Sequence, residues 1–102
     1  MNGTLDPATP LANAQIAAVE FTARHQTFVP VPWSPHGVIF SSAVKTPAAP
    51  ACGIQMLVSF VADPRAAPDT TCIDELAPID FNGGDPALVE QLFGRADVWE
   101  ND

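Results

Sequence analysis

Eleven prolines in 102 residues are the feature that most restricts how this chain can fold. Proline lacks a backbone N–H and has a fixed φ, so it is excluded from helix interiors and from central strands. The most apolar stretch without a proline is 53–63, which lies between Pro50 and Pro64. We therefore expect the rest of the fold to be organised around this stretch.

The stretch 53–63 fits two periodicities. As a helix, it repeats apolar residues at the i, i+3, i+4, i+7 spacing, namely at Ile54, Leu57, Val58 and Val61. As a strand, it has one wholly apolar face, made of Ile54, Met56, Val58, Phe60 and Ala62. Its short length, the flanking breakers and its Val, Ile and Phe content favour the strand. The sequence predicts a central strand over 54–62, with Val58 almost fully buried.

Residues 10–24 also have two interpretations. Thr9 as N-cap and Pro10 at the first helical position are typical of a helix start. The alanine content favours helix up to about Ala18, whereas the run 19–22 favours strand. The boundary between the two stays open at this point.

Local composition predicts the structure of three shorter segments. Two prolines restrict 26–33 to an edge strand or a polyproline-like segment. The apolar run within 38–44 predicts another strand, antiparallel to the proline-containing one if the turn between them is tight. Residues 71–74 predict a single helical turn that ends before Pro78.

The C-terminal part holds the clearest local signal. Asp85 is a good N-cap, Pro86 suits the first helical position, and Gly94 is a typical stop. The sequence predicts a helix at about 86–93, packed on the sheet through its apolar side.

Together these patterns predict one domain over residues 1–102. Its fold class is α+β, mainly β, with a small antiparallel sheet centred on 54–62, a C-terminal helix at about 86–93 and Pro-rich loops. Residues 1–8 lack periodicity and are expected to form an N-terminal arm that is ordered only where it docks. Residues 95–102 are expected to form an acidic tail.

The negative charge is confined to one part of the chain. The formal net charge is −8, and residues 1–62 contribute none of it, because two acidic side chains balance two basic ones. Residues 63–102 hold ten acidic side chains and two arginines. Such a field repels nucleic acid and anionic membranes and attracts basic protein surfaces. The alternative interpretation is that the acids only keep a small apolar protein soluble.

No arrangement of residues indicates catalysis or a metal site. His25, His36, Cys52 and Cys72 lack the short spacing that builds half a zinc site locally. No serine lies in a nucleophile elbow, and the acidic residues lack the spacing of a calcium loop. We therefore expect a protein that is not an enzyme, without cofactor, metal or small-molecule substrate.

Cysteine content and hydropathy bear on location. No apolar run is long enough to span a bilayer, and the N-terminus lacks the basic and apolar regions of a signal peptide. A cytoplasmic protein is expected, in the host cytoplasm or a virion if the protein is viral. In a reducing compartment Cys52 and Cys72 are expected to be buried thiols, with a disulfide as the alternative.

The candidate interface residues are aromatic side chains near prolines or acids, together with the acids of the tail. Trp33 lies between Pro32 and Ser34, where a turn begins, and core packing is the alternative for each aromatic residue. The full set is Phe28, Trp33, Asp97, Trp99, Glu100 and Asp102.

These features predict a structural or interaction protein of a larger assembly. A phage virion decoration or connector component is one example, since the Ala- and Pro-rich, Lys-poor composition resembles that of small proteins of high-GC bacteria and their phages. Pro-rich arms and an apolar surface would contact a protein partner or other copies of the chain. The alternative is a small acidic antagonist, including one that imitates nucleic acid, bound to a basic surface of a host or defence protein.

Overall fold

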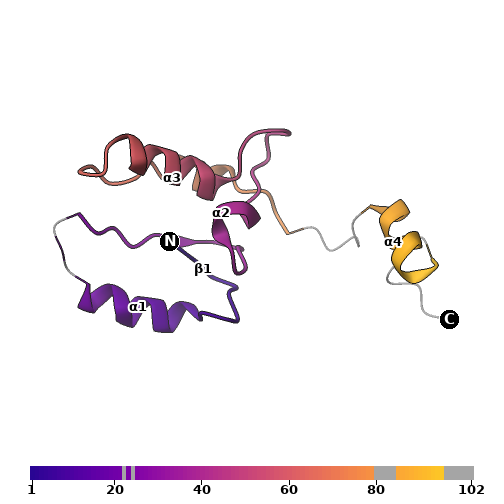
Figure 1. The fold of residues 1–102 in the computed structure, drawn as a ribbon, viewed down its shortest axis with the longest axis horizontal. Coiled ribbons are helices and arrows are strands. Elements are labelled where there is room, and N and C mark those ends of the chain that lie inside the picture. Colours follow the sequence, from indigo (N-terminus) through magenta and orange to yellow (C-terminus); the bar gives the residue numbers. More distant parts are fainter. Residues whose placement is uncertain (22, 24, 80–84, 96–102) are drawn as a thin grey trace.

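A computed structural model describes residues 1–21, 23, 25–79 and 85–95. In this part of the chain the α-helices are α1 (Leu11–Glu20), α2 (Val38–Ser41), α3 (Cys52–Ala62) and α4 (Pro86–Phe93). A 3-10 helix, η1 (Thr71–Glu75), confirms the helical turn predicted before Pro78. The strands are β1 (Asn2–Gly3) and β2 (Pro30–Val31), which pair in parallel (Figure 1). The prediction of a mainly β fold with an antiparallel sheet is therefore wrong.

The stretch 52–62 forms helix α3, not the predicted central strand. Its buried residues, Cys52, Gly53 and Met56, share one helical face. Val58, expected to be buried, is 62% exposed. A central strand needs a hydrogen-bonded neighbour on both sides, and the proline-rich segments around it are poor donors. A helix pairs its own backbone, so the helical periodicity prevails.

The predicted strand at 38–44 is also wrong, because Val38–Ser41 is helix α2. Its N-cap, Gly37, has a φ of 78°, which starts the helix with a sharp change of direction. Only Val44 makes a strand-like contact, an isolated antiparallel bridge with Leu76.

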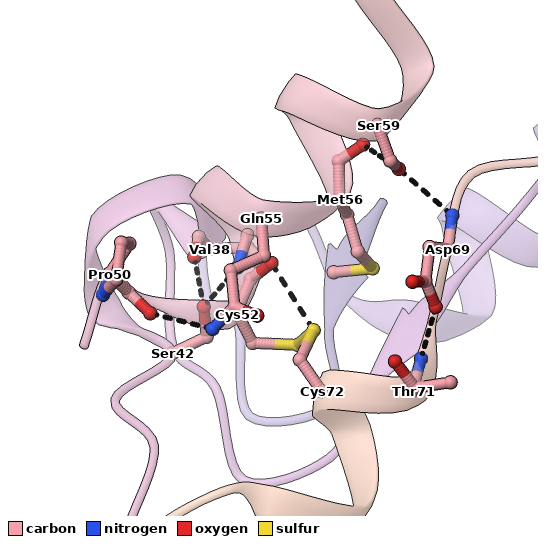
Figure 2. The surroundings of a disulfide bond; sticks show 11 residues. Val38, Ser42, Pro50, Cys52, Gln55, Met56, Ser59, Asp69, Thr71 and Cys72 are labelled. Carbon is pink, nitrogen blue, oxygen red and sulfur yellow. Dashed lines mark hydrogen bonds between the residues drawn. A yellow bond between two sulfur atoms is a disulfide. The ribbon is translucent and has the colours of Figure 1, made fainter. Parts of the chain in front are cut away.

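Gly53 lets α3 pack directly against α2. A Cβ at this position would lie 2.5 Å from the carbonyl oxygen of Val38, so a larger residue would force the helices apart. Ser42, which follows α2, joins them: its hydroxyl donates to the Val38 carbonyl at 2.7 Å and accepts from the Gly53 N–H at 2.8 Å. The contact is therefore both close and hydrogen-bonded (Figure 2).

The N-terminal arm docks on its own chain. The N–H groups of Asn2 and Thr4 donate to the carbonyls of Val29 and Val31, each at 3.0 Å. The proline-containing segment thus takes part in the pairing through its carbonyl groups, which accept. The N–H groups that its prolines lack are not needed for these hydrogen bonds. This fits its prediction as an edge strand. Gly3 is required here, because a Cβ on it would lie 2.0 Å from a backbone oxygen of residue 34.

Helix α1 resolves the open interpretation of residues 10–24 in favour of helix as far as Glu20. Thr9 is not its N-cap, since Pro10 occupies that position and the Thr9 hydroxyl bonds Asp6 instead. No residue of α1 is buried. Its apolar side chains therefore add little to the core.

Helix α4 confirms the prediction for 86–93. The Asp85 side chain accepts from the Ala87 N–H at 2.9 Å, and Gly94 ends the helix with a φ of 72°. The helix does not pack on a sheet, however, and it lies apart from the body of the molecule in Figure 1. The radius of gyration is 16.9 Å, against about 13 Å for a compact chain of this length.

The core is small and contains a disulfide. Its buried members are Val29, Val31, Val38, Cys52, Met56 and Cys72. Cys52, at the start of α3, is bonded to Cys72 in η1, with their Cα atoms 5.4 Å apart (Figure 2). The expectation of two buried thiols is therefore wrong. Composition and compartment carry no information on which side chains the fold brings together, whereas the Cα separation fits a bridge.

Candidate interaction surface

Trp33 has a backbone conformation that bulky residues rarely adopt. Its φ is 58°, in the left-handed region. The Trp33 N–H donates to the hydroxyl of Thr4 at 3.0 Å, and the Leu5 N–H donates to the carbonyl of Ser34 at 3.1 Å. The docked N-terminal arm therefore holds this turn in place. The Trp33 side chain is nevertheless 62% exposed.

A pocket of about 520 Å³ lies beside this side chain. We call it the Trp33 pocket. The described residues that line it carry no charge, and its apolar walls come from the arm, the 32–35 turn and the segment after η1. The principal lining residues are Leu5, Pro32, Trp33, Leu76, Pro78 and Ile79.

Backbone hydrogen bonds fix the far wall of the Trp33 pocket. The Ala77 N–H donates to the Ala43 carbonyl at 2.9 Å, and the Lys45 N–H donates to the Glu75 carbonyl at 2.8 Å. These bonds flank the bridge between Val44 and Leu76. The segment that follows η1 is thereby held opposite the arm, although the two are about seventy residues apart in the sequence.

Asp6 ties the arm to the turn that follows Trp33. Its carboxylate accepts from the hydroxyl and N–H of Thr9, lies 2.9 Å from Nδ1 of His36, and accepts from the Ala8 N–H at 2.9 Å. These bonds, those of Thr9 first, lower the pKa of Asp6 below its usual range. The Ser41 hydroxyl donates to the His36 backbone carbonyl and not to the ring. The Asp6–His36 pair thus serves the structure of the turn.

The remaining exposed apolar side chains lie mainly on helices. Ile16 and Val19 on α1 are 67% and 73% exposed. Both α3 and α4 also carry large apolar side chains that are more than half exposed: Val58, Val61, Leu88, Leu92 and Phe93. Each of these helices therefore presents apolar side chains to solvent.

The structure separates the candidate interface residues. Trp33 lines its pocket, whereas Phe28, 37% exposed, lines a different groove beside α1. The predicted tail residues Asp97, Trp99, Glu100 and Asp102 lie outside the described residues. Sequence reasoning missed Leu5 and Ile79, because neither belongs to a periodic segment and only the fold brings them to Trp33.

The same structure bears on metals and membranes. With Cys52 and Cys72 bonded to each other, the four candidate zinc ligands named from the sequence are not a ligand set. Among residues 1–79 and 85–95, leaving out 22 and 24, no three His, Cys, Asp or Glu side chains are arranged to hold a metal ion. Over the same residues, no helix has the length and hydropathy to cross a membrane.

Comparison of the chain with protein-family models, curated proteins and solved structures finds no match.

Proposed function

We propose that this chain is a non-enzymatic interaction protein of a larger assembly, and that it contacts a protein partner through the Trp33 pocket. One observation carries the proposal. Trp33 is held in a strained backbone conformation by the arm, yet its large side chain stays mostly exposed at the edge of a pocket whose described lining residues are mainly apolar and carry no charge. Strain of this kind is retained at sites where a conformation serves function.

A fixed aromatic side chain is well suited to recognition. Trp and Tyr dominate the binding energy of many interfaces, because they bury a large area with few rotatable bonds. A backbone that is already fixed in the free protein reduces the ordering cost of binding. Trp33 meets both conditions, and the adjacent Pro32 and Pro35 stiffen the turn further.

The small core supports the same proposal. Helix α1 buries no residue of its own and leaves Ile16 and Val19 exposed. An isolated helix of ten residues is marginal in water, so most of its stability must come from packing. A partner that covers apolar helix faces would supply such packing. A virion decoration protein, held among neighbouring subunits, is one kind of protein that fits this description.

Site-specific photo-crosslinking in the producing cells tests the proposal. A photoreactive amino acid replaces Trp33, and as a matched control it replaces Phe40, another exposed aromatic residue that does not line the Trp33 pocket. We expect a discrete crosslinked species from position 33 and little from position 40. Equal yields from both positions, or none from position 33, would contradict the proposed function.

The acidic half of the chain favours a second candidate, an antagonist of a basic protein. Exposed acidic side chains lie just before η1 and within it, at Asp69 and Asp74 respectively, with few cations nearby in the sequence. Binding of this kind is steered by charge and weakens as salt rises. Crosslinking from position 33 that persists at high ionic strength supports the apolar interface, whereas its loss there supports the antagonist.

The cellular location is also a proposal. The cytoplasmic location expected from the sequence stays a prediction, and the Cys52–Cys72 bridge weighs against it, because structural disulfides form mainly in oxidising compartments. Trapping free thiols with an alkylating agent as the cells are opened decides the point. Two alkylated cysteines per chain support a reducing compartment, and none supports an oxidising one.

A further inference from the structure

We propose that a groove between α3 and η1, on a part of the surface separate from the Trp33 pocket, binds an extended basic segment of a partner protein. We call it the η1 groove. It shares no described lining residue with the Trp33 pocket, so this inference goes beyond the proposed function and stands or falls separately. Both the shape of the groove and the sign of its charge support this occupant.

The η1 groove consists of two adjoining hollows, of about 370 Å³ and about 430 Å³. Gln55, Thr71 and Cys72 line both hollows, so the two meet where α3 packs against η1. In Figure 2, Asp69 and Thr71 face α3 from the segment that leads into η1. The described lining residues all fall within 44–75, a part of the chain that the structure describes without a gap. Two adjoining hollows suit successive side chains of one extended segment.

The hollow beside α3 is mainly apolar. Ile54, Val58 and Ala62 line it, and their spacing of four residues places them on one face of the helix. Val58 is 62% exposed, so its side chain is accessible to a partner. An apolar side chain that entered this hollow would remove apolar surface from water on both sides of the contact. The occupant should therefore carry an apolar residue.

Every described charged side chain in the lining of the η1 groove is a carboxylate, namely Asp69, Asp74 and Glu75. All three residues are exposed, and none forms an ion pair within the described part of the chain. Hydrogen bonds from Thr71 lower the pKa of Asp69 and so keep it ionised. Lys45 approaches η1, but its Nζ donates to the backbone carbonyl of Asp74 at 3.1 Å. The net negative charge attracts cationic side chains and repels nucleic acid and anionic membranes.

The walls of the η1 groove are already fixed in the free protein. The bond between Cys52 and Cys72 joins α3 to η1. In the connector before α3, a turn closes with a hydrogen bond from the Ala49 N–H to the Thr46 carbonyl at 3.2 Å. Ala48 in this turn has a φ of 62°, a left-handed conformation that glycine adopts more readily. Walls that are formed in advance reduce the ordering cost when an extended segment binds.

Selection from a library of random short peptides, displayed on phage and tested against the immobilised full chain, examines which chemistry the protein binds. We expect enrichment of peptides that combine Arg or Lys with an apolar residue. Enrichment of acidic or wholly uncharged peptides would overturn the inference, and so would a selection that enriches no peptide. For a selected basic peptide, the Kd should rise with ionic strength, because exposed charges are screened by salt.

Fluorescence anisotropy of a selected peptide with variants of the chain locates its binding site. Asp74→Asn/Glu75→Gln should raise the Kd by at least about tenfold, because charge-assisted hydrogen bonds to the peptide are lost. Val58→Ser should also raise the Kd, through lost apolar contact. The matched control, Glu20→Gln/Glu90→Gln, removes two carboxylates from exposed positions outside the groove and should leave the Kd nearly unchanged. An equal rise in both double variants would show only general charge attraction and would overturn the groove as the site.

Circular dichroism verifies that each variant is folded, and all five changed residues are exposed. If Asp74→Asn/Glu75→Gln fails to fold, Glu75→Gln alone still removes one carboxylate from the groove.

A further variant, Trp33→Ala, distinguishes this inference from the proposed function. A selected peptide whose affinity falls in Trp33→Ala, and not in the groove variants, binds the Trp33 pocket. That result overturns the inference and leaves the proposed function standing. Peptide binding that depends on the η1 groove, together with no crosslink from position 33, overturns the proposed function alone.

Discussion

The carboxylate of Asp6 lies 2.9 Å from Nδ1 of His36, thirty residues further along the chain. The same carboxylate accepts hydrogen bonds from Thr9 and Ala8, just before α1 begins. Asp6 is buried, whereas the His36 side chain is 66% exposed. One acidic side chain therefore joins the N-terminal arm, the entry to α1 and the turn after Trp33.

The lowered pKa of Asp6 predicts that the folded chain loses stability in acid. Its hydrogen bonds lower its pKa in the folded chain below the unfolded value, which is about 4. Its contribution is thus complete above the unfolded pKa and is lost as the pH falls towards the folded pKa. Thermal melts should show that Asp6→Asn lowers the melting temperature at neutral pH, and that the difference from the wild type shrinks in acid. Glu90→Gln controls for loss of a charge. A difference that is constant with pH would contradict this role.

Substitutions of Ser42 and of its neighbour Ser41 provide a matched pair of variants that tests the contact between α2 and α3. Ser42 is 2% exposed, and Ser42→Ala leaves the buried N–H of Gly53 without its hydroxyl acceptor. The loss of unfolding free energy should be about 1–3 kcal/mol. Ser41→Ala removes only an exposed hydrogen bond to His36 and should change stability by less than about 0.5 kcal/mol. Urea denaturation measures both, and equal losses would argue against the α2–α3 contact described above.

Met56 and Val58 distinguish the helix from the predicted strand. Met56 is 1% exposed, so Met56→Ala should cost about 2–5 kcal/mol. Val58 is 62% exposed, so even Val58→Asp should change stability by no more than about 0.5 kcal/mol. The strand interpretation predicts a cost of several kcal/mol for Val58→Asp. Thermal melts of the two variants decide between the helix and the strand. A severe loss of stability in Val58→Asp would support the strand interpretation.

The disulfide should contribute measurably to stability. It closes a loop between residues 20 apart, for which chain entropy in the unfolded state predicts about 3 kcal/mol. Reduction of the wild type should lower the denaturation midpoint accordingly. The Cys52→Ala/Cys72→Ala double variant should unfold near the reduced wild type and should not respond to reductant. An unchanged midpoint after full reduction of the wild type would show that the bridge contributes nothing.

Where local chemistry is sufficient, the sequence predicts the structure correctly. Asp85, Pro86 and Gly94 act within one or two turns of the chain, and α4 has the expected bounds. The turn at 71–74 and the restriction of 26–33 to a sheet edge likewise depend on nearby residues. The position of Trp33 among prolines at a turn left an exposed side chain and a core side chain both open, and the structure shows it exposed.

The sequence interpretation is wrong where the decision depends on distant parts of the chain. Residues 54–62 suit both a strand and a helix, and the choice depends on whether neighbouring strands exist. The same holds for the bridge: Cys52 and Cys72 meet only because α3 and η1 pack together. The arm could be recognised as aperiodic, but not as a strand that pairs with residues 30 and 31.

By itself, then, the sequence determined the proline limits, the caps of α4 and the uneven charge, since each depends on a residue and its near neighbours. Tertiary structure decided that 52–62 is a helix, that the cysteines are bonded, and that Leu5, Trp33 and Ile79 form one pocket. Those outcomes depend on contacts between residues far apart in the chain, and a local pattern of apolar and polar residues does not encode such contacts.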